Sequence, residues 1–436
     1  MRRFVVFFLC ILLLFMISSC DGSQDNETKS STNENNQFNP TKSEDIYNYL
    51  VEKIRIADYT DIYNHTSEEI HNLIAEPQFI KIFTDITDIS GKLLYVEQKT
   101  VKTVNGIDII NATLNFDNIE LDLQISVKNL KICGIAKNIM IKKSFDVKHS
   151  NGITERYFVI ENGVYKLNAV YTFNESSDLN TAVLMIPGSG PSDYNETVGL
   201  LQPFYDIAIS LAEEGISTLR VDKRTLNYGN IISSDFGVND EYFIDYTTAL
   251  EFLKLNGYDK LILLGHSLGG QIAAKIAADN ACVDGVIFFN SSARHLADIA
   301  CDQFVSVDIS NAEVYMNYCE IAKNVHTSNT KGYYYFGVND YYWASYNELD
   351  IKQCIQEGNF KSLVVNSTYD IQTFDADINI WSEIFDENSD AEIHVFNDIS
   401  HYGYKIDPNN ETLLYSDVEF PTELSELFVD FCKERV

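Results

Sequence analysis

Positive charge is scarce in this sequence. It contains 32 Lys and Arg residues against 64 Asp and Glu residues among 436, which gives a formal net charge of −32 at pH 7. A polyanion of this kind repels nucleic acids and anionic lipid head groups, because both carry negative charge. The composition therefore disfavours binding through a basic patch, and no nucleic-acid partner is expected.

The sequence also lacks an apolar run long enough to cross a bilayer comfortably. The N-terminal run at 4–17 has fourteen residues, whereas a membrane-spanning helix needs about 20. Two arginines precede it, and two serines and Cys20 follow it, which is the order of a secretory signal with its cleavage site. Small residues directly before a cysteine resemble a bacterial lipobox. Residues 1–20 are therefore expected to form a lipoprotein signal peptide, with Cys20 acylated as the first mature residue.

This interpretation predicts an exported protein that a lipid anchor alone holds to the cell membrane, on the extracytoplasmic side. The alternatives are an ordinary signal peptide cut nearby or an uncleaved anchor. Six cysteines follow residue 20, and their spacing contains no C-x-x-C pair and no zinc-binding pattern. Buried thiols are expected, since the spacing assigns no disulfide.

The rest of the chain can bury a core, because 45% of the residues are apolar. Residues 21–44 are polar with a single Phe and are expected to form a disordered tether. Residues 45–135 begin with helical periods at 46–54 and 70–83 and continue with alternating apolar and polar positions. This order predicts a small α+β domain.

Residues 150–436 show a different pattern, in which short apolar strands alternate with helices. The pattern predicts an α/β domain with a doubly wound, mostly parallel sheet. It is interrupted at about 293–357 by an aromatic-rich segment, which we expect to be a helical cap near the substrate pocket. The expected strands are 182–186, 216–221, 260–264, 285–289, 363–365 and 392–396.

Residues 265–269 read Gly-His-Ser-Leu-Gly and match the pattern G-x-S-x-G. They lie between the apolar strand 260–264 and a helix at 271–278, which is the strand–turn–helix context of a nucleophilic serine. The turn is sharp, so the glycines leave room for the serine to project and for the helix to pass behind it. The pattern predicts Ser267 as the nucleophile, with a structural serine in a glycine-rich turn as the alternative.

A serine hydroxyl needs a general base to become a nucleophile at neutral pH. In folds with this kind of turn, the chain order is serine, acid and histidine. His401 follows the strand 392–396, in the loop where the base is expected. His394 is the alternative, but it lies inside that strand, where side chains alternate between the two faces of the sheet.

The base in turn needs a carboxylate to orient it. Asp370 comes just after the strand 363–365 and is the predicted acid. Asp375 and Asp377 are alternatives, but they fall at the start of the next helix, where carboxylates typically cap the helix.

The negatively charged oxygen of a tetrahedral intermediate needs two N–H donors. Leu268, directly after the nucleophile, is expected to supply one backbone N–H. The other is expected from the Gly- and Pro-rich loop at 187–193, with Ser189 as the first choice and Gly190 as the alternative.

Together these segments resemble the α/β-hydrolase superfamily over roughly residues 165–436. They are similar to bacterial carboxylesterases whose oxyanion loop reads H-G-S-G-P-x-D-R, although Pro187 and Tyr194 stand where that group usually has His and Arg. The resemblance also implies that 222–224 form a structural ion-pair corner near the site. Residues 45–135 resemble a small domain of unknown function, with a nuclear-transport-factor-like cone shape, that often precedes such hydrolases. The segments that carry the hydrolase resemblance are 188–191, 221–224, 265–270, 342–343, 368–370, Gln372 and His401.

The expected activity is hydrolysis of small carboxylic esters, with short acyl chains, through an acyl-enzyme on Ser267. His401 would take the serine proton and return it to the leaving alcohol, and Asp370 would support the charged imidazole. No metal and no organic cofactor is expected. The same groups could cleave amides or transfer acyl groups, and an inactive binding lipoprotein on a hydrolase scaffold is the alternative of another class.

Overall fold

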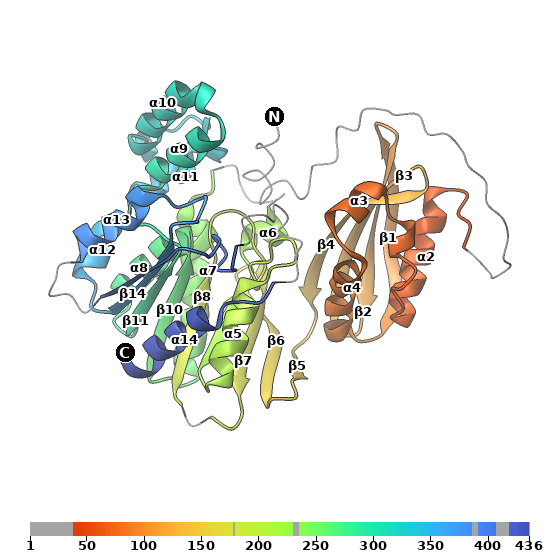
Figure 1. The fold of residues 1–436 in the computed structure, drawn as a ribbon, viewed down its shortest axis with the longest axis horizontal. Coiled ribbons are helices and arrows are strands. Elements are labelled where there is room, and N and C mark those ends of the chain that lie inside the picture. Colours follow the sequence, from red (N-terminus) through yellow and green to blue (C-terminus); the bar gives the residue numbers. More distant parts are fainter. Residues whose placement is uncertain (1–37, 178, 230–234, 386–390, 407–417, 436) are drawn as a thin grey trace. The chain divides into compact units, whose positions relative to one another are not determined.

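The chain folds into two units that divide between Lys142 and Lys143. The computed structural model describes residues 38–177, 179–229, 235–385, 391–406 and 418–435 (Figure 1). The expected signal peptide, Cys20 and the tether up to residue 37 lie outside these ranges. None of the helices within them is both long and apolar enough to cross a membrane.

The first unit is a four-stranded antiparallel sheet with helices on one face (Figure 1). Strand β3 explains this arrangement, because its alternate residues from Ile119 to Val127 are buried, whereas Glu120 and Asp122 between them are exposed. The elements are α2 (Ser43–Ile56), α3 (Glu68–Leu73), α4 (Glu76–Ser90), β1 (Leu93–Val104), β2 (Ile107–Phe116), β3 (Ile119–Lys128) and β4 (Lys131–Ile141).

The second unit is built around a nine-stranded sheet in the order β15-β14-β11-β10-β8-β9-β7-β6-β5. The six strands from β15 to β9 run parallel, and β7, β6 and β5 pair antiparallel at one edge. The strands are β5 (Phe145–Lys148), β6 (Ile153–Asn162), β7 (Tyr165–Asn174), β8 (Thr181–Ile186), β9 (Ser217–Val221), β10 (Lys260–His266), β11 (Gly285–Phe289), β14 (Lys361–Ser367) and β15 (Glu392–Phe396).

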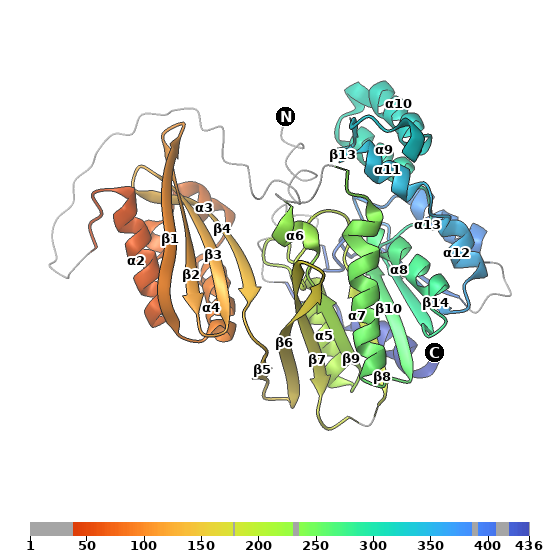
Figure 2. The ribbon, with the colours of Figure 1, turned by 180° about the vertical axis from the view of Figure 1, so that it is seen from behind.

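Helices cover both faces of this sheet, so its central strands are apolar on both sides. Val183 and Met185 of β8 face a core shared with α5 (Pro203–Glu213) and α14 (Thr422–Asp430). Leu184, between them, faces the opposite core, shared with α7 (Ile244–Leu255) and α8 (Leu268–Asp279). Figure 2 shows the α7 side of the sheet.

The interruption predicted at 293–357 forms a cap with a core of its own. Trp343 is buried in that core together with Cys301 and Cys319, while Tyr333 and Tyr334 are exposed. Its elements are α9 (Leu296–Val307), α10 (Ala312–Lys323), β12 (Tyr334–Tyr335), β13 (Val338–Asn339), α11 (Asp340–Tyr346) and α12 (Ile351–Glu357). The mostly parallel sheet, the cap and the preceding small α+β unit confirm the predicted fold class.

Candidate active site

Ser267 sits at a sharp turn between β10 and α8. Its backbone has φ 53° and ψ −124°, a strained conformation for a residue with a side chain. A Cβ on Gly265 would lie 2.3 Å from the carbonyl oxygen of Gly269, and one on Gly269 would lie 2.1 Å from the carbonyl oxygen of Ile186. The two glycines are therefore required for the chain to pass so close to itself.

Asp370 and His401 lie side by side after the neighbouring strands β14 and β15. His401 Nδ1 is 2.6 Å from Asp370 Oδ2, and both side chains are buried. Since Nδ1 donates to the carboxylate in the neutral imidazole, Nε2 is left with a lone pair that can accept a proton.

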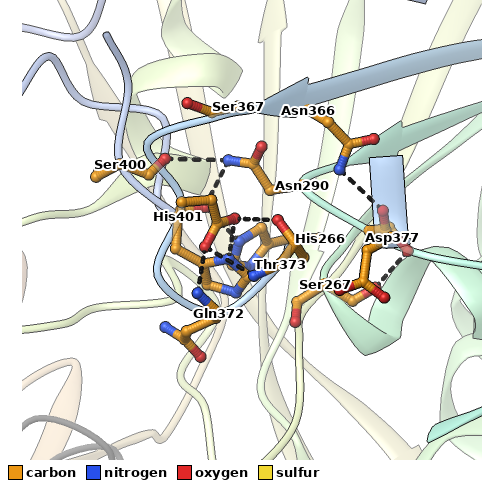
Figure 3. A network of polar contacts seen from close by, with 12 residues as sticks. His266, Ser267, Asn290, Asn366, Ser367, Gln372, Thr373, Asp377, Ser400 and His401 are labelled. Carbon is orange, nitrogen blue, oxygen red and sulfur yellow. Dashed lines mark hydrogen bonds and ion pairs between the residues drawn. The ribbon is translucent and has the colours of Figure 1, made fainter. Parts of the chain in front are cut away.

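The Asp370 carboxylate is held in its charged form. Burial opposes ionisation, but the imidazole of His401 and the donors of Gln372 and Thr373 hold the pKa of Asp370 below its usual value. Those donors are the Gln372 N–H at 2.7 Å, the Thr373 N–H at 3.1 Å and the Thr373 hydroxyl at 2.7 Å (Figure 3). The site therefore keeps a negative charge beside the imidazole, where a positive charge develops in acyl transfer.

The predicted nucleophile and the predicted base share no hydrogen bond among the described residues, but His266, next to Ser267, contacts His401. Ser267 Oγ and His401 Nε2 make no bond to each other in the part of the chain that the structure describes. The ring of His266, next to Ser267, lies 4.6 Å from the His401 ring between centroids. Catalytic hydrogen bonds are often long without substrate and tighten when it binds.

The alternative residues from the sequence lie elsewhere or have other partners. His394 is in β15 with 43% of its side chain exposed, and its closest acid is Glu392 at 3.6 Å. Asp377 accepts the Phe374 N–H at 2.8 Å as a cap of α13 (Asp375–Ile384) and also pairs with Arg294 at 3.0 Å.

The oxyanion loop lies directly against the nucleophile. A Cβ on Gly188 would be 3.0 Å from Ser267 Cβ. The Gly188 N–H already donates to Glu196 Oε1 at 2.7 Å, whereas Ser189 is exposed. Leu268 is the first residue of α8, so its N–H has no partner within the helix. The predicted donors therefore stay Leu268 and Ser189, with Gly190 as the alternative.

The two positions that differ from the carboxylesterase loop are both buried. Pro187 brings no side-chain donor to the loop, whose contacts include those of the Gly188 backbone and the bond from the Lys223 N–H to the Ser192 carbonyl. The Tyr194 N–H donates to Asp222 Oδ1 at 2.8 Å, which ties the loop to the end of β9.

Sequence reasoning missed a buried pair beneath the turn, Glu196 and His266. His266 Nδ1 is 2.8 Å from Glu196 Oε1, and its Nε2 is 2.8 Å from the carbonyl oxygen of His401. Both ring nitrogens thus face acceptors, an arrangement that favours the doubly protonated ring. Burial opposes protonation, but the Glu196 carboxylate raises the pKa of His266 above its usual value.

Polar residues at the ends of the strands hold the loop that carries His401 (Figure 3). Asn290, after β11, donates to the carbonyl oxygens of Ser400 at 3.1 Å and His401 at 2.8 Å. The Ser367 hydroxyl, at the end of β14, donates to the Ile399 carbonyl at 2.6 Å. Their position directly at the end of apolar strands is a sequence signal that could have identified them.

Comparisons with known proteins agree with this architecture. Residues 244–361 match a family described as the alpha/beta hydrolase family. Esterase EstD of Thermotoga maritima is 27% identical over 303 residues, which cover 67% of this chain and 72% of that protein.

Two solved esterase structures are among those to which the chain is similar. Est1E from Butyrivibrio proteoclasticus matches with a TM-score of 0.43 and 13% identity, covering 63% of this chain and 96% of its own. An esterase of Pyrococcus furiosus matches with a TM-score of 0.43 and 12% identity. The match covers 67% of this chain and 97% of the esterase chain. With its mostly parallel sheet, its serine turn and the matching family segment, the second unit has the fold of the α/β hydrolases.

Proposed function

We propose that this protein is a serine hydrolase that cleaves carboxylic esters. The observation that carries the proposal is the strained turn of Ser267 beside the 2.6 Å pair of His401 and Asp370. The likeness to an esterase supports carboxylic esters as the substrate class.

In the proposed mechanism, Ser267 Oγ attacks the ester carbonyl carbon and its proton moves to His401 Nε2. Asp370 stabilises the resulting imidazolium, and the N–H groups of Leu268 and Ser189 bind the oxyanion. The C–O bond to the alcohol then breaks, and His401 protonates the leaving oxygen. Water repeats the sequence on the acyl-enzyme, so that one ester and one water give one acid and one alcohol.

We further propose that the acyl chains are short. Three large aromatic side chains of α11 are held by structural hydrogen bonds, which supports a pocket that is not lined by them along its length. The hydroxyl of Tyr342 donates to Glu241 at 2.8 Å, that of Tyr346 donates to Gln271 at 2.7 Å, and the Trp343 ring N–H donates to the Tyr335 carbonyl at 3.1 Å.

The test is a panel of p-nitrophenyl esters of increasing acyl length, with peptides and acylated glycans, assayed on a form that begins after Cys20. A fluorophosphonate probe is added in parallel, because it labels an activated serine whatever the natural substrate is. Labelling of Ser267 together with hydrolysis of short esters is expected. Labelling with cleavage of peptides only would make the protein an amidase, and no labelling would indicate a binding protein.

The location of the protein is a further part of the proposal. We propose that it is exported and held to the outer side of the cell membrane by a lipid on Cys20, on the basis of the sequence pattern at 1–20. Such a location would give the enzyme extracellular or periplasmic esters as substrates.

A further inference from the structure

Lys223, directly after β9, is a lysine whose side chain is completely buried, with 0% exposed. Lysine is almost never fully buried unless it is paired. Its ammonium group has three N–H donors, and three acceptors surround it. They are the carbonyl oxygen of Gly188 at 2.9 Å, the hydroxyl of Tyr242 at 2.7 Å and a carboxylate oxygen of Glu241 at 2.7 Å.

Two of these partners come from one short segment, η3 (Asn239–Phe243). Glu241 balances the lysine charge, and its other oxygen accepts the hydroxyl of Tyr342 from the cap at 2.8 Å. Tyr242 is both acceptor and donor, since its hydroxyl donates to the Gly188 carbonyl at 2.6 Å. The Gly188 oxygen therefore receives two hydrogen bonds, one of them from a charged group.

The position of this carbonyl fixes the direction of the next N–H. In a trans peptide the C=O and the N–H point in opposite directions, and no peptide bond in the described part of the chain is cis. Because the Gly188 carbonyl points at Lys223, the Ser189 N–H points away from it. Glu196 holds the Gly188 N–H on the other side, so Gly188 is fixed at both its nitrogen and its oxygen.

The charge also affects the strength of the donor. A cation at the oxygen end of a peptide increases the polarisation of that peptide, and chains of hydrogen bonds strengthen one another in this way. The Ser189 N–H is thereby a stronger donor to an oxyanion beside Ser267. An N–H in a peptide whose carbonyl accepts only from neutral groups would be a weaker donor.

We propose that Lys223 is a positioning residue of the oxyanion hole, which orients and polarises the Gly188–Ser189 peptide through the Gly188 carbonyl. The inference rests on the proposed esterase function. Lys223 touches neither the substrate nor the reacting atoms, so its effect must pass through that one peptide.

The chain offers a matched control in the next residue. Arg224 is also buried and pairs with Asp245 through two hydrogen bonds of 2.7 Å. It makes no bond to the oxyanion loop among the residues that the structure describes. Lys223→Met and Arg224→Met therefore both remove a cation from a buried ion pair, but only the first changes the contacts of Gly188.

The experiment compares kcat and KM for p-nitrophenyl acetate, and the inhibition constant of a trifluoromethyl ketone that forms a tetrahedral adduct. For Lys223→Met we expect kcat to fall about tenfold to a hundredfold, somewhat less than loss of a direct oxyanion donor. KM should change little, and inhibitor affinity should fall by about the same factor as kcat. Arg224→Met should keep kcat within about threefold, whatever it does to stability.

If Lys223→Met does not fold, Lys223→Met/Glu241→Gln avoids an unpaired buried carboxylate, and Tyr242→Phe removes one of the two bonds to the carbonyl. Both should show the same linked loss of kcat and inhibitor affinity, smaller for Tyr242→Phe. Three results would overturn the inference without affecting the proposed esterase function. They are an unchanged kcat in the folded variants, equal losses of kcat in Lys223→Met and Arg224→Met, or a change in KM alone. A wild-type protein without ester hydrolysis or probe labelling would overturn the proposed function itself.

Discussion

Ser267 combines a reactive position with a backbone conformation that costs stability. Residues with a side chain in such regions cost about 1 to 3 kcal/mol, and glycine avoids most of this cost. In the described part of the chain the Ser267 hydroxyl makes no hydrogen bond, so its loss should leave the packing intact.

This reasoning gives a prediction for two variants at one position. Ser267→Ala should lower ester turnover by at least about a thousandfold with a nearly unchanged melting temperature. Ser267→Gly should be equally inactive but more stable than Ser267→Ala, by about 1 kcal/mol or more. Activity assays and urea unfolding of both variants test this, and retained turnover in either would reject Ser267 as the nucleophile.

The two histidines near the end of the sheet should behave differently when they are replaced. His401→Ala should be nearly inactive, because it removes the proposed base, whose Nδ1 pairs with Asp370. His394→Ala should keep most of the activity, since that side chain lies on β15, is 43% exposed and has Glu392 as its acidic neighbour. Turnover per folded molecule distinguishes the two, and the reverse result would show that the base had been assigned to the wrong loop.

The Glu196–His266 pair should make stability depend on pH. Burial lowers the pKa of His266, but the Glu196 carboxylate raises it by more, so the pKa in the folded state is above its ordinary value. The folded state therefore binds this proton more tightly than the unfolded state does. The contribution of this pair to the free energy of unfolding is complete below about pH 6.5, the ordinary pKa of histidine. It is lost as the pH rises through the higher pKa of His266 in the folded state. Urea unfolding at several pH values should therefore show a loss of stability above about pH 6.5 in the wild type that is smaller in Glu196→Gln. Equal pH dependence in both proteins would contradict the assignment.

At the scale of elements, the strands that build the site were predictable and the contacts between them were not. The apolar runs of β8, β10, β11 and β14 stand out in the sequence because both of their faces are buried. Asp370 could be placed because it follows such a strand. His401 follows β15, whose residues are only partly buried or exposed, and was placed by the chain order of serine, acid and histidine. Glu196 could not, since its partner His266 is 70 positions away and nothing local marks the contact.

Helix boundaries show the same limit. The apolar period at 70–83 predicts one helix, but the structure has α3 ending at Leu73 and α4 beginning at Glu76. Pro77 lies in the first turn of α4, where its fixed φ and missing N–H favour the start of a helix over its interior. Phe79 and Phe83 of α4 are buried as an amphipathic helix requires, but α3 buries none of its residues and Leu73 is 44% exposed. The periodicity therefore missed the break.

The junction between β8 and α8 should be the least tolerant of added volume. A Cβ on Gly269 would overlap backbone of Ile186 and Pro187, so Gly269→Ala must displace the strand end that carries the oxyanion loop. We expect a large loss of both stability and kcat. Gly163→Ala is the control, because that glycine has a φ of 62° and open space around it. It should cost only about 1 to 2 kcal/mol and leave kcat unchanged; urea unfolding and kinetics measure both effects. Equal effects of the two substitutions would contradict the close approach at Gly269.

At the scale of the whole molecule, the charge of −32 bears on the proposed anchoring of the protein to a membrane. Stable anchoring usually needs two signals, such as two acyl chains or one chain with a basic patch. An acidic protein offers no basic patch, so anchoring should depend on acylation alone.

Cys20→Ala should therefore prevent incorporation of labelled fatty acid and leave the protein either unprocessed or released. Metabolic labelling and cell fractionation measure this. The soluble activity of the released form should match that of the wild type, because Cys20 precedes both folded units. A wild-type protein that carries no lipid but is cut near residue 20 would instead be an ordinary secreted hydrolase.

Helix α11 belongs to two cores at once. Trp343 packs inside the cap, whereas Tyr342 and Tyr346 on the same helix pack with α7 and α8 against the sheet. Helix α11 is therefore one link between the cap and the sheet. Helix α9 provides another, since the side chain of Gln303 donates to the Gln372 carbonyl oxygen at 2.7 Å, close to the predicted acid Asp370. Under the proposed esterase function, substitutions in the cap core around Trp343 would therefore change the range of esters admitted more readily than they would change the turn of Ser267.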